Sequence, residues 1–86
     1  MRKDTAVFNS AGATKVDSTI AHLVHEASAF DCSIYLIKGD RRANAKSLLG
    51  VISLGIVDGD QITIQADGED ADNAVTAMKK FIQNPA

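Results

Sequence analysis

Short apolar stretches bounded by glycine, asparagine and aspartate predict four β-strands in this chain. The expected strands cover residues 5–9, 33–38, 41–45 and 61–66. The last is the clearest, because Ile62 and Ile64 alternate with polar residues and therefore share one face. Gly39-Asp40 is a hairpin turn signal, and the strand that follows it is polar enough to form a sheet edge.

Between the strands, apolar residues stand three and four positions apart, which predicts three helices. The first helix is expected from Asp17 to Phe30, a short second helix between Ser47 and Gly55, and the third from Asp70 onward. The expected buried stripes of the two long helices are Ile20, Leu23, Val24 and Ala27, and Ala74, Val75, Ala77, Met78, Phe81 and Ile82. The order βαββαβα predicts an α+β fold, an open-faced β-sandwich in which a four-stranded antiparallel sheet is covered on one face by three helices.

Composition narrows the class of protein. The 86 residues suffice for a single domain, residues 1–86, and 45% hydrophobic residues are ordinary for a soluble chain. A net charge of −2 argues against nucleic acid as a partner, and no apolar run approaches the ~20 residues that span a bilayer. No apolar stretch typical of a signal peptide follows Arg2 and Lys3, and the single Cys32, expected to be an ordinary thiol in a turn, fits a reducing compartment. We therefore expect a cytoplasmic protein with no membrane partner, no cofactor and no metal.

Residues 44–56 combine a hydroxyl at a helix start with a surplus of apolar side chains. As a plain cap, the Ser47 hydroxyl would accept a hydrogen bond from a backbone amide and contribute about 1 kcal/mol. As a phosphoserine, it would bring roughly −1.5 to −2 charges to the positive end of the helix, with Lys46 helping to neutralise them. The sequence leaves both interpretations open.

The apolar residues of this segment exceed what one helix lying on a sheet can bury. They are Leu48, Leu49, Val51, Ile52, Leu54 and Ile56. Because such a helix buries a stripe of a little over ~100°, we expect Leu48, Leu49 and Ile52 to face water. Together with Ala21 and His25 of the first helix they would form a surface that binds a partner. The alternative is a deeper core that buries them.

Two histidines, His22 and His25, lie three positions apart inside the first helix, where backbone amides are already bonded. A pair of surface histidines is the favoured interpretation. A weak metal site lacks a cysteine or carboxylate at a suitable spacing. The remaining possibility is a non-standard phosphoacceptor.

Residues 46–55 resemble the regulatory-serine segment of HPr, the phosphocarrier of the bacterial sugar phosphotransferase system. The resemblance extends over essentially the whole length of the chain, without a gap from Ala27 onward, and includes residues 27–30, 62–64 and 68–70. Residues 44–47 and 68–70 are most similar to Crh, the catabolite-repression paralogue of HPr. The resemblance implies the open-faced sandwich, a non-enzymatic role in sugar uptake or carbon catabolite regulation, and Ser47 as the phosphorylated residue.

The resemblance also implies a phosphocarrier histidine at the start of the first helix, followed by an arginine and a proline. A gapless alignment places Val16 at the histidine and Ser18 at the arginine, whereas a shift by one residue places Lys15 at the histidine. We therefore expect a degenerate phosphocarrier site at Lys15, Val16 and Ser18.

Three functions stay open: a regulatory module switched at Ser47, a phosphocarrier that uses His22 or His25, and a scaffold without phosphorylation. The partners implied are HPr kinase/phosphorylase, a transcription regulator and phosphotransferase-system proteins, and the protein is expected to be a monomer or weak dimer. The expected partner-binding residues are Ala21, His25, Lys46, Leu48, Leu49 and Ile52.

Overall fold

Seven elements follow one another in the order that the apolar pattern predicts. The structure, a computed structural model, describes residues 1–9 and 16–83, with the backbone alone for residues 16–19. The elements are β1 (Arg2–Val7), α1 (Val16–Ser28), β2 (Ser33–Lys38), β3 (Arg41–Asn44), α2 (Leu48–Ser53), β4 (Gln61–Asp67) and α3 (Ala71–Gln83).

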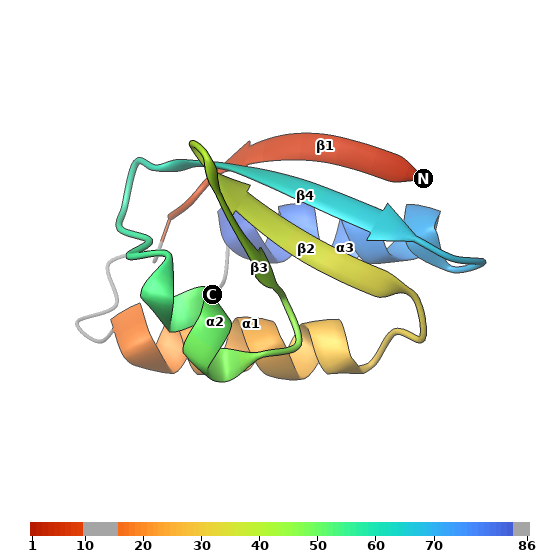
Figure 1. Cartoon of the computed structure of the whole chain (residues 1–86), viewed down its shortest axis with the longest axis horizontal. Helices are drawn as coiled ribbons and strands as arrows, with labels where there is room; N and C mark the ends of the chain where they lie inside the picture. Colours follow the sequence, from red (N-terminus) through yellow and green to blue (C-terminus); the bar gives the residue numbers. More distant parts are fainter. Residues whose placement is uncertain (10–15, 84–86) are drawn as a thin grey trace.

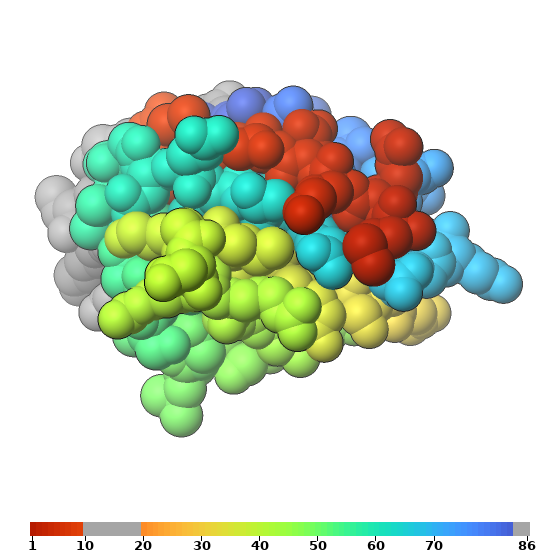
Figure 2. Space-filling model, turned by 45° about the horizontal axis from the view of Figure 1, so that its top comes forward, coloured from red at the N-terminus to blue at the C-terminus, as the bar shows by residue number. Residues whose placement is uncertain are grey.

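The four strands form one antiparallel sheet in the order β1-β4-β2-β3. All three helices lie on the same face of this sheet (Figure 1), which confirms the open-faced α+β sandwich. The register places Ile64, Leu36 and Ala43 side by side across β4, β2 and β3, and all three are buried beneath the helices. Figure 2 looks toward the sheet from above and shows its uncovered face.

The core between sheet and helices is mainly aliphatic. Each helix contributes at least one fully buried side chain: Leu23 from α1, Val51 from α2 and Met78 from α3. Strand β4 alternates buried and more accessible residues, because only every second side chain of a strand points toward the helices. No helix in the described residues is long and apolar enough to cross a membrane.

Strand β1 differs from its predicted position at residues 5–9. It runs from Arg2 to Val7, because its polar first residues pair with β4 at the edge of the sheet. Phe8 follows the strand; its side chain is fully buried, and its N–H donates to the Asp60 carbonyl at 2.8 Å.

Helix α1 ends at Ser28 rather than at the predicted Phe30. The Ser28 hydroxyl donates to the Val24 carbonyl at 2.9 Å. The next two amides then bind carbonyls only three positions back, Ala29 to Glu26 and Phe30 to Ala27, both at 3.2 Å. The last turn is therefore tighter than an α-helix.

Candidate functional site

Ser47 is exposed and caps the N-terminus of α2. Its backbone is extended, at φ −106° and ψ 111°, and its hydroxyl accepts the N–H of Gly50 at 3.2 Å. Asn44 shapes the preceding turn: its side-chain oxygen accepts the Lys46 N–H and its carbonyl accepts the Ser47 N–H, each at 2.9 Å. The hydroxyl is thus a helix cap that also faces solvent, so capping and chemical access occur together.

The surplus apolar residues of α2 divide between core and surface. Val51, Leu54 and Ile56 are buried, while Leu48, Leu49 and Ile52 are 43%, 80% and 44% exposed. Here "docking patch" denotes Leu48, Leu49 and Ile52. A deeper core that buries these three residues is therefore wrong, and α2 projects beyond the sheet as the green residues in Figure 2.

The first helix supplies the other expected docking residues. Helix α1 packs against α2 (Figure 1), and Ala21 and His25 are both exposed on it. His22 is also exposed, and its ring makes an edge-on contact with Phe81 of α3 at 6.4 Å between centroids. Among the described residues, no group of three His, Cys, Asp or Glu side chains is placed to hold a metal.

Lys46 is half-buried, and its side chain is already engaged in a hydrogen bond to a backbone carbonyl. Its Nζ donates to the carbonyl of Phe30, two residues beyond the end of α1, at 2.6 Å. This hydrogen bond connects the segment that follows α1 to Lys46, the residue that precedes the α2 cap. The sequence assigned Lys46 to neutralising a phosphate, a role that would require it to share or leave this carbonyl.

Two of the three residues expected to form a degenerate phosphocarrier site lie at the start of α1. Val16 is the first residue of the helix and Ser18 lies in its first turn, whereas Lys15 lies outside the described residues.

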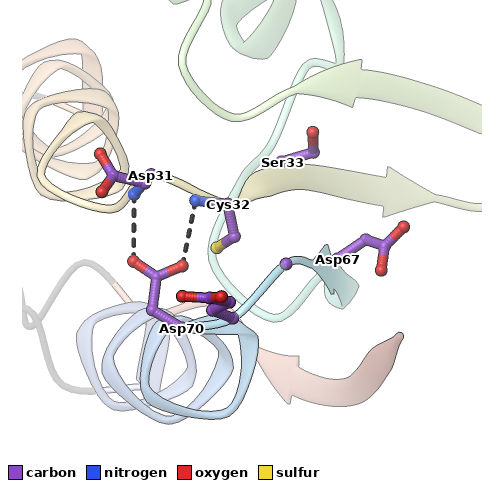
Figure 3. A pocket seen from close by; sticks show the side chains of 7 residues that line it. Asp31, Cys32, Ser33, Asp67 and Asp70 are labelled. Carbon is purple, nitrogen blue, oxygen red and sulfur yellow. Dashed lines mark hydrogen bonds between the residues drawn. The ribbon is translucent and has the colours of Figure 1, made fainter.

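An acidic hollow of about 380 Å³ lies at the end of the sheet near the N-terminus of α3 (Figure 3). It is lined by Asp31, Cys32, Ser33, Asp67, Gly68, Glu69 and Asp70. The Asp70 carboxylate accepts the N–H groups of Asp31 and Cys32, each at 3.0 Å, and so joins α3 to the start of β2. In Figure 3 the carboxylates of Asp31 and Asp67 point away from that of Asp70. The Asp70 carboxylate therefore has a structural role: it holds the turn before β2 against the N-terminus of α3.

Cys32 lies in a turn, as expected, and its thiol is free. Its side chain is buried, and burial together with a hydrogen bond to Asp70 raises the thiol pKa to about 11. The same hydrogen bond, with the Asp31 amide, lowers the pKa of Asp70. Because 38 residues separate the two side chains, no local sequence pattern could have indicated this contact.

Together the sheet, the three helices and the exposed serine define a class, the small open-faced β-sandwich proteins. The chain belongs to the HPr family of the bacterial phosphotransferase system. The family model described as "PTS HPr component phosphorylation site" matches residues 10–84.

Known proteins support this assignment over most of the chain. The chain is 45% identical over 64 residues to the phosphocarrier protein HPr of Mycoplasma capricolum, covering 74% of this chain and 72% of that protein. It is 35% identical over 63 residues to the HPr-like protein Crh of Bacillus subtilis, covering 73% and 74%. The crystal structure of a phosphocarrier protein HPr from Bacillus anthracis superposes with a TM-score of 0.83 and 32% identity, covering 95% of this chain and 96% of that one.

Proposed function

We propose that this chain is a regulatory, non-catalytic protein-binding module of the HPr family that is switched by phosphorylation of Ser47. The observation that carries the proposal is the exposed Ser47 hydroxyl at the start of a helix whose Leu48, Leu49 and Ile52 side chains are also exposed. Its partners would be HPr kinase/phosphorylase and, in the cytoplasm, a transcription regulator or phosphotransferase-system proteins.

Phosphorylation would change the docking surface without unfolding it. The phosphate adds roughly −1.5 to −2 charges and three acceptor oxygens at the positive end of α2, where a negative charge is tolerated. The patch begins at the next residue, so the charge would stand at its edge. A partner that buries the patch would have to accommodate this charge, and docking would be gated by it. Ala21, His25 and Lys46 would contribute from beside α2.

The same proposal holds that the histidine relay is absent. Val16 carries no group able to hold a phosphoryl group, and Ser18 offers no guanidinium to stabilise one. His22 and His25 lie inside α1 beyond its first turn, away from the free amides of a helix N-terminus. The chain would act as a monomer or weak dimer through the single domain 1–86.

The test is to incubate the chain with ATP and HPr kinase/phosphorylase and to map the product by mass spectrometry. An acid-stable phosphate on Ser47, absent from the Ser47→Ala variant, is the expected result. A parallel incubation uses phosphoenolpyruvate and enzyme I. An acid-labile phosphate on His22 or His25 would show a phosphocarrier instead. If neither incubation adds a phosphate while a partner protein still binds, the chain would be a scaffold.

A further inference from the structure

Helix α2 has little in its own sequence to hold it in place. It spans only six residues, and isolated helices shorter than about 12–15 residues are marginal in water. Val51 is its one buried residue, and Gly50 lowers its intrinsic helix propensity. No acidic residue lies in its first turn and no basic residue in its last turn. The docking patch therefore depends on contacts from other elements for its position.

Two cations of the β2–β3 hairpin bind the C-terminal end of α2. Arg41 Nη1 donates to the carbonyl of Ser53, the last residue of α2, at 3.2 Å, and Lys38 Nζ donates to the carbonyl of Gly55, two residues beyond it, at 2.7 Å. The last carbonyls of a helix lack intrahelical partners and carry the negative end of its dipole, so cations placed there stabilise it. The hairpin thus supplies the charge that the last turn of α2 lacks.

The register of the hairpin makes this arrangement specific. Lys38 and Arg41 stand directly opposite each other, and like charges in that relation are unfavourable on their own. The α2 carbonyls and Asp60 offset that repulsion. Lys38 Nζ lies 2.8 Å from Asp60 Oδ2, with the two side chains 31% and 23% exposed.

Asp60 extends the contact into the loop that follows α2. The carboxylate oxygen that pairs with Lys38 also accepts the Val57 N–H at 2.9 Å. Lys38 therefore contacts Gly55, the glycine just after α2, directly and Val57 of the α2–β4 loop through Asp60. A single ammonium group connects β2 to both segments.

We infer that Lys38, assisted by Arg41, is a positioning residue for the docking patch. It holds the C-terminal end of α2 so that Leu48, Leu49 and Ile52 are presented as one surface. The structural part of this inference stands on the hydrogen bonds alone, while its consequence for recognition rests on the function proposed above.

Arg42 offers a matched control on the same strand. Successive side chains of a strand point to opposite faces, so Arg42 lies on the uncovered face of the sheet. Its guanidinium stacks on the Tyr35 ring at 4.5 Å from the centroid. An Arg42→Met variant removes one positive charge from β3 and leaves the contacts to α2 in place.

Amide hydrogen exchange of the full chain tests the structural part. The amides of Leu54 and Gly55 are the readout, because they donate to carbonyls of α2, each at 3.1 Å. Lys38→Met keeps most of the aliphatic stem and removes the donor, so exchange at these amides should rise roughly tenfold, as expected for the loss of a charged donor. Lys38→Arg should restore protection, and Arg42→Met should leave it unchanged.

Two results would overturn the inference. One is unchanged exchange at Leu54 and Gly55 in Lys38→Met, and the other is an equal rise throughout β4, which would indicate general loss of stability. The kinetics of phosphorylation by HPr kinase/phosphorylase supply the functional readout, with Lys38→Met expected to raise KM and leave kcat nearly unchanged. If Ser47 of the unaltered chain takes no phosphate, the proposed function fails while the exchange result still decides the role of Lys38.

Discussion

Leu49 separates docking from folding more sharply than any other residue of the docking patch. Its side chain is 80% exposed, so folding buries about one fifth of its surface. Full burial of a leucine contributes about 1.5–3 kcal/mol, so one fifth corresponds to roughly 0.3–0.6 kcal/mol. We therefore expect Leu49→Ala to lower the free energy of unfolding by no more than about 0.6 kcal/mol.

A partner that covers the patch would bury the other four fifths of Leu49. That surface corresponds to roughly 1.2–2.4 kcal/mol, which raises Kd about 8- to 60-fold when it is lost. Alanine retains the β-carbon, so these values are upper limits. The expected variant is as stable as the parent chain and binds distinctly more weakly.

Urea unfolding and titration calorimetry with HPr kinase/phosphorylase measure the two quantities. Val7→Ala is the control, because Val7 is 52% exposed but lies on β1, away from α2. Its Kd should match that of the parent chain. An unchanged Kd in Leu49→Ala, or a loss of unfolding free energy above about 1.5 kcal/mol, would refute the assignment of Leu49 to an outward docking role.

Four further predictions follow from individual contacts. Ser47→Ala should lower the free energy of unfolding in urea by about 1 kcal/mol, because the N–H three positions on loses its acceptor, whereas Ser47→Asp should retain the cap. Gly68→Ala should lower the melting temperature more than Gly59→Ala. The two glycines both have positive φ, 144° at Gly68 and 91° at Gly59, but of the two only Gly68 would place a β-carbon against another side chain, that of Cys32 at 2.7 Å. Cys32 should react slowly with iodoacetamide at pH 8 until the chain is unfolded, because its thiol pKa is raised to about 11. Hydrogen bonds from the Cys32 thiol and from backbone amides lower the pKa of Asp70. The Asp70 carboxylate therefore stabilises the folded chain above its unfolded pKa, and this stabilisation is lost as pH falls below about 4. Acid unfolding followed by circular dichroism should show a weaker pH dependence in Asp70→Asn.

Local patterns predicted most of the fold. Alternation of Ile62 and Ile64 located β4, and the hydroxyl of Ser47 with the glycine at position 55 located the two ends of α2. These elements are predictable because their signals lie within a few neighbouring residues: an alternating face, a cap, and a glycine with φ of 67°.

The start of strand β1 could not be predicted from local patterns. Arg2, Lys3 and Asp4 have the polarity of a surface tail, yet they form a strand because they pair with β4. Ion pairs also join this strand to α3, from Arg2 to Asp72 and from Asp4 to Lys79. Partners some 70 residues apart cannot be found from composition or periodicity.

The candidate site divides in the same way. Exposure of Ser47 and of the patch could be predicted, since a short helix with too many apolar residues must leave some of them outside. The partners of Lys38 and Lys46 could not, because each cation contacts a backbone carbonyl 16 or 17 residues away. The charge of Lys38 and Lys46 predicts that each side chain binds an acceptor, but it does not indicate which backbone carbonyl will lie within reach in the fold.

These contacts bear on how α2 would respond if Ser47 is phosphorylated as proposed. Lys46, just before α2, binds the segment that follows α1, and Gly55, just after α2, is bound to β2 through Lys38, while Leu49 contributes little to folding. In the proposed function, the position of α2 and the recognition of a partner would therefore depend on different side chains, and a change in one need not disturb the other. A phosphate on Ser47 would be added where α2 depends on its own cap, while the hairpin still holds the opposite end. Its expected effect is consequently a local change of charge and shape beside the patch, with the sheet and the long helices left in place.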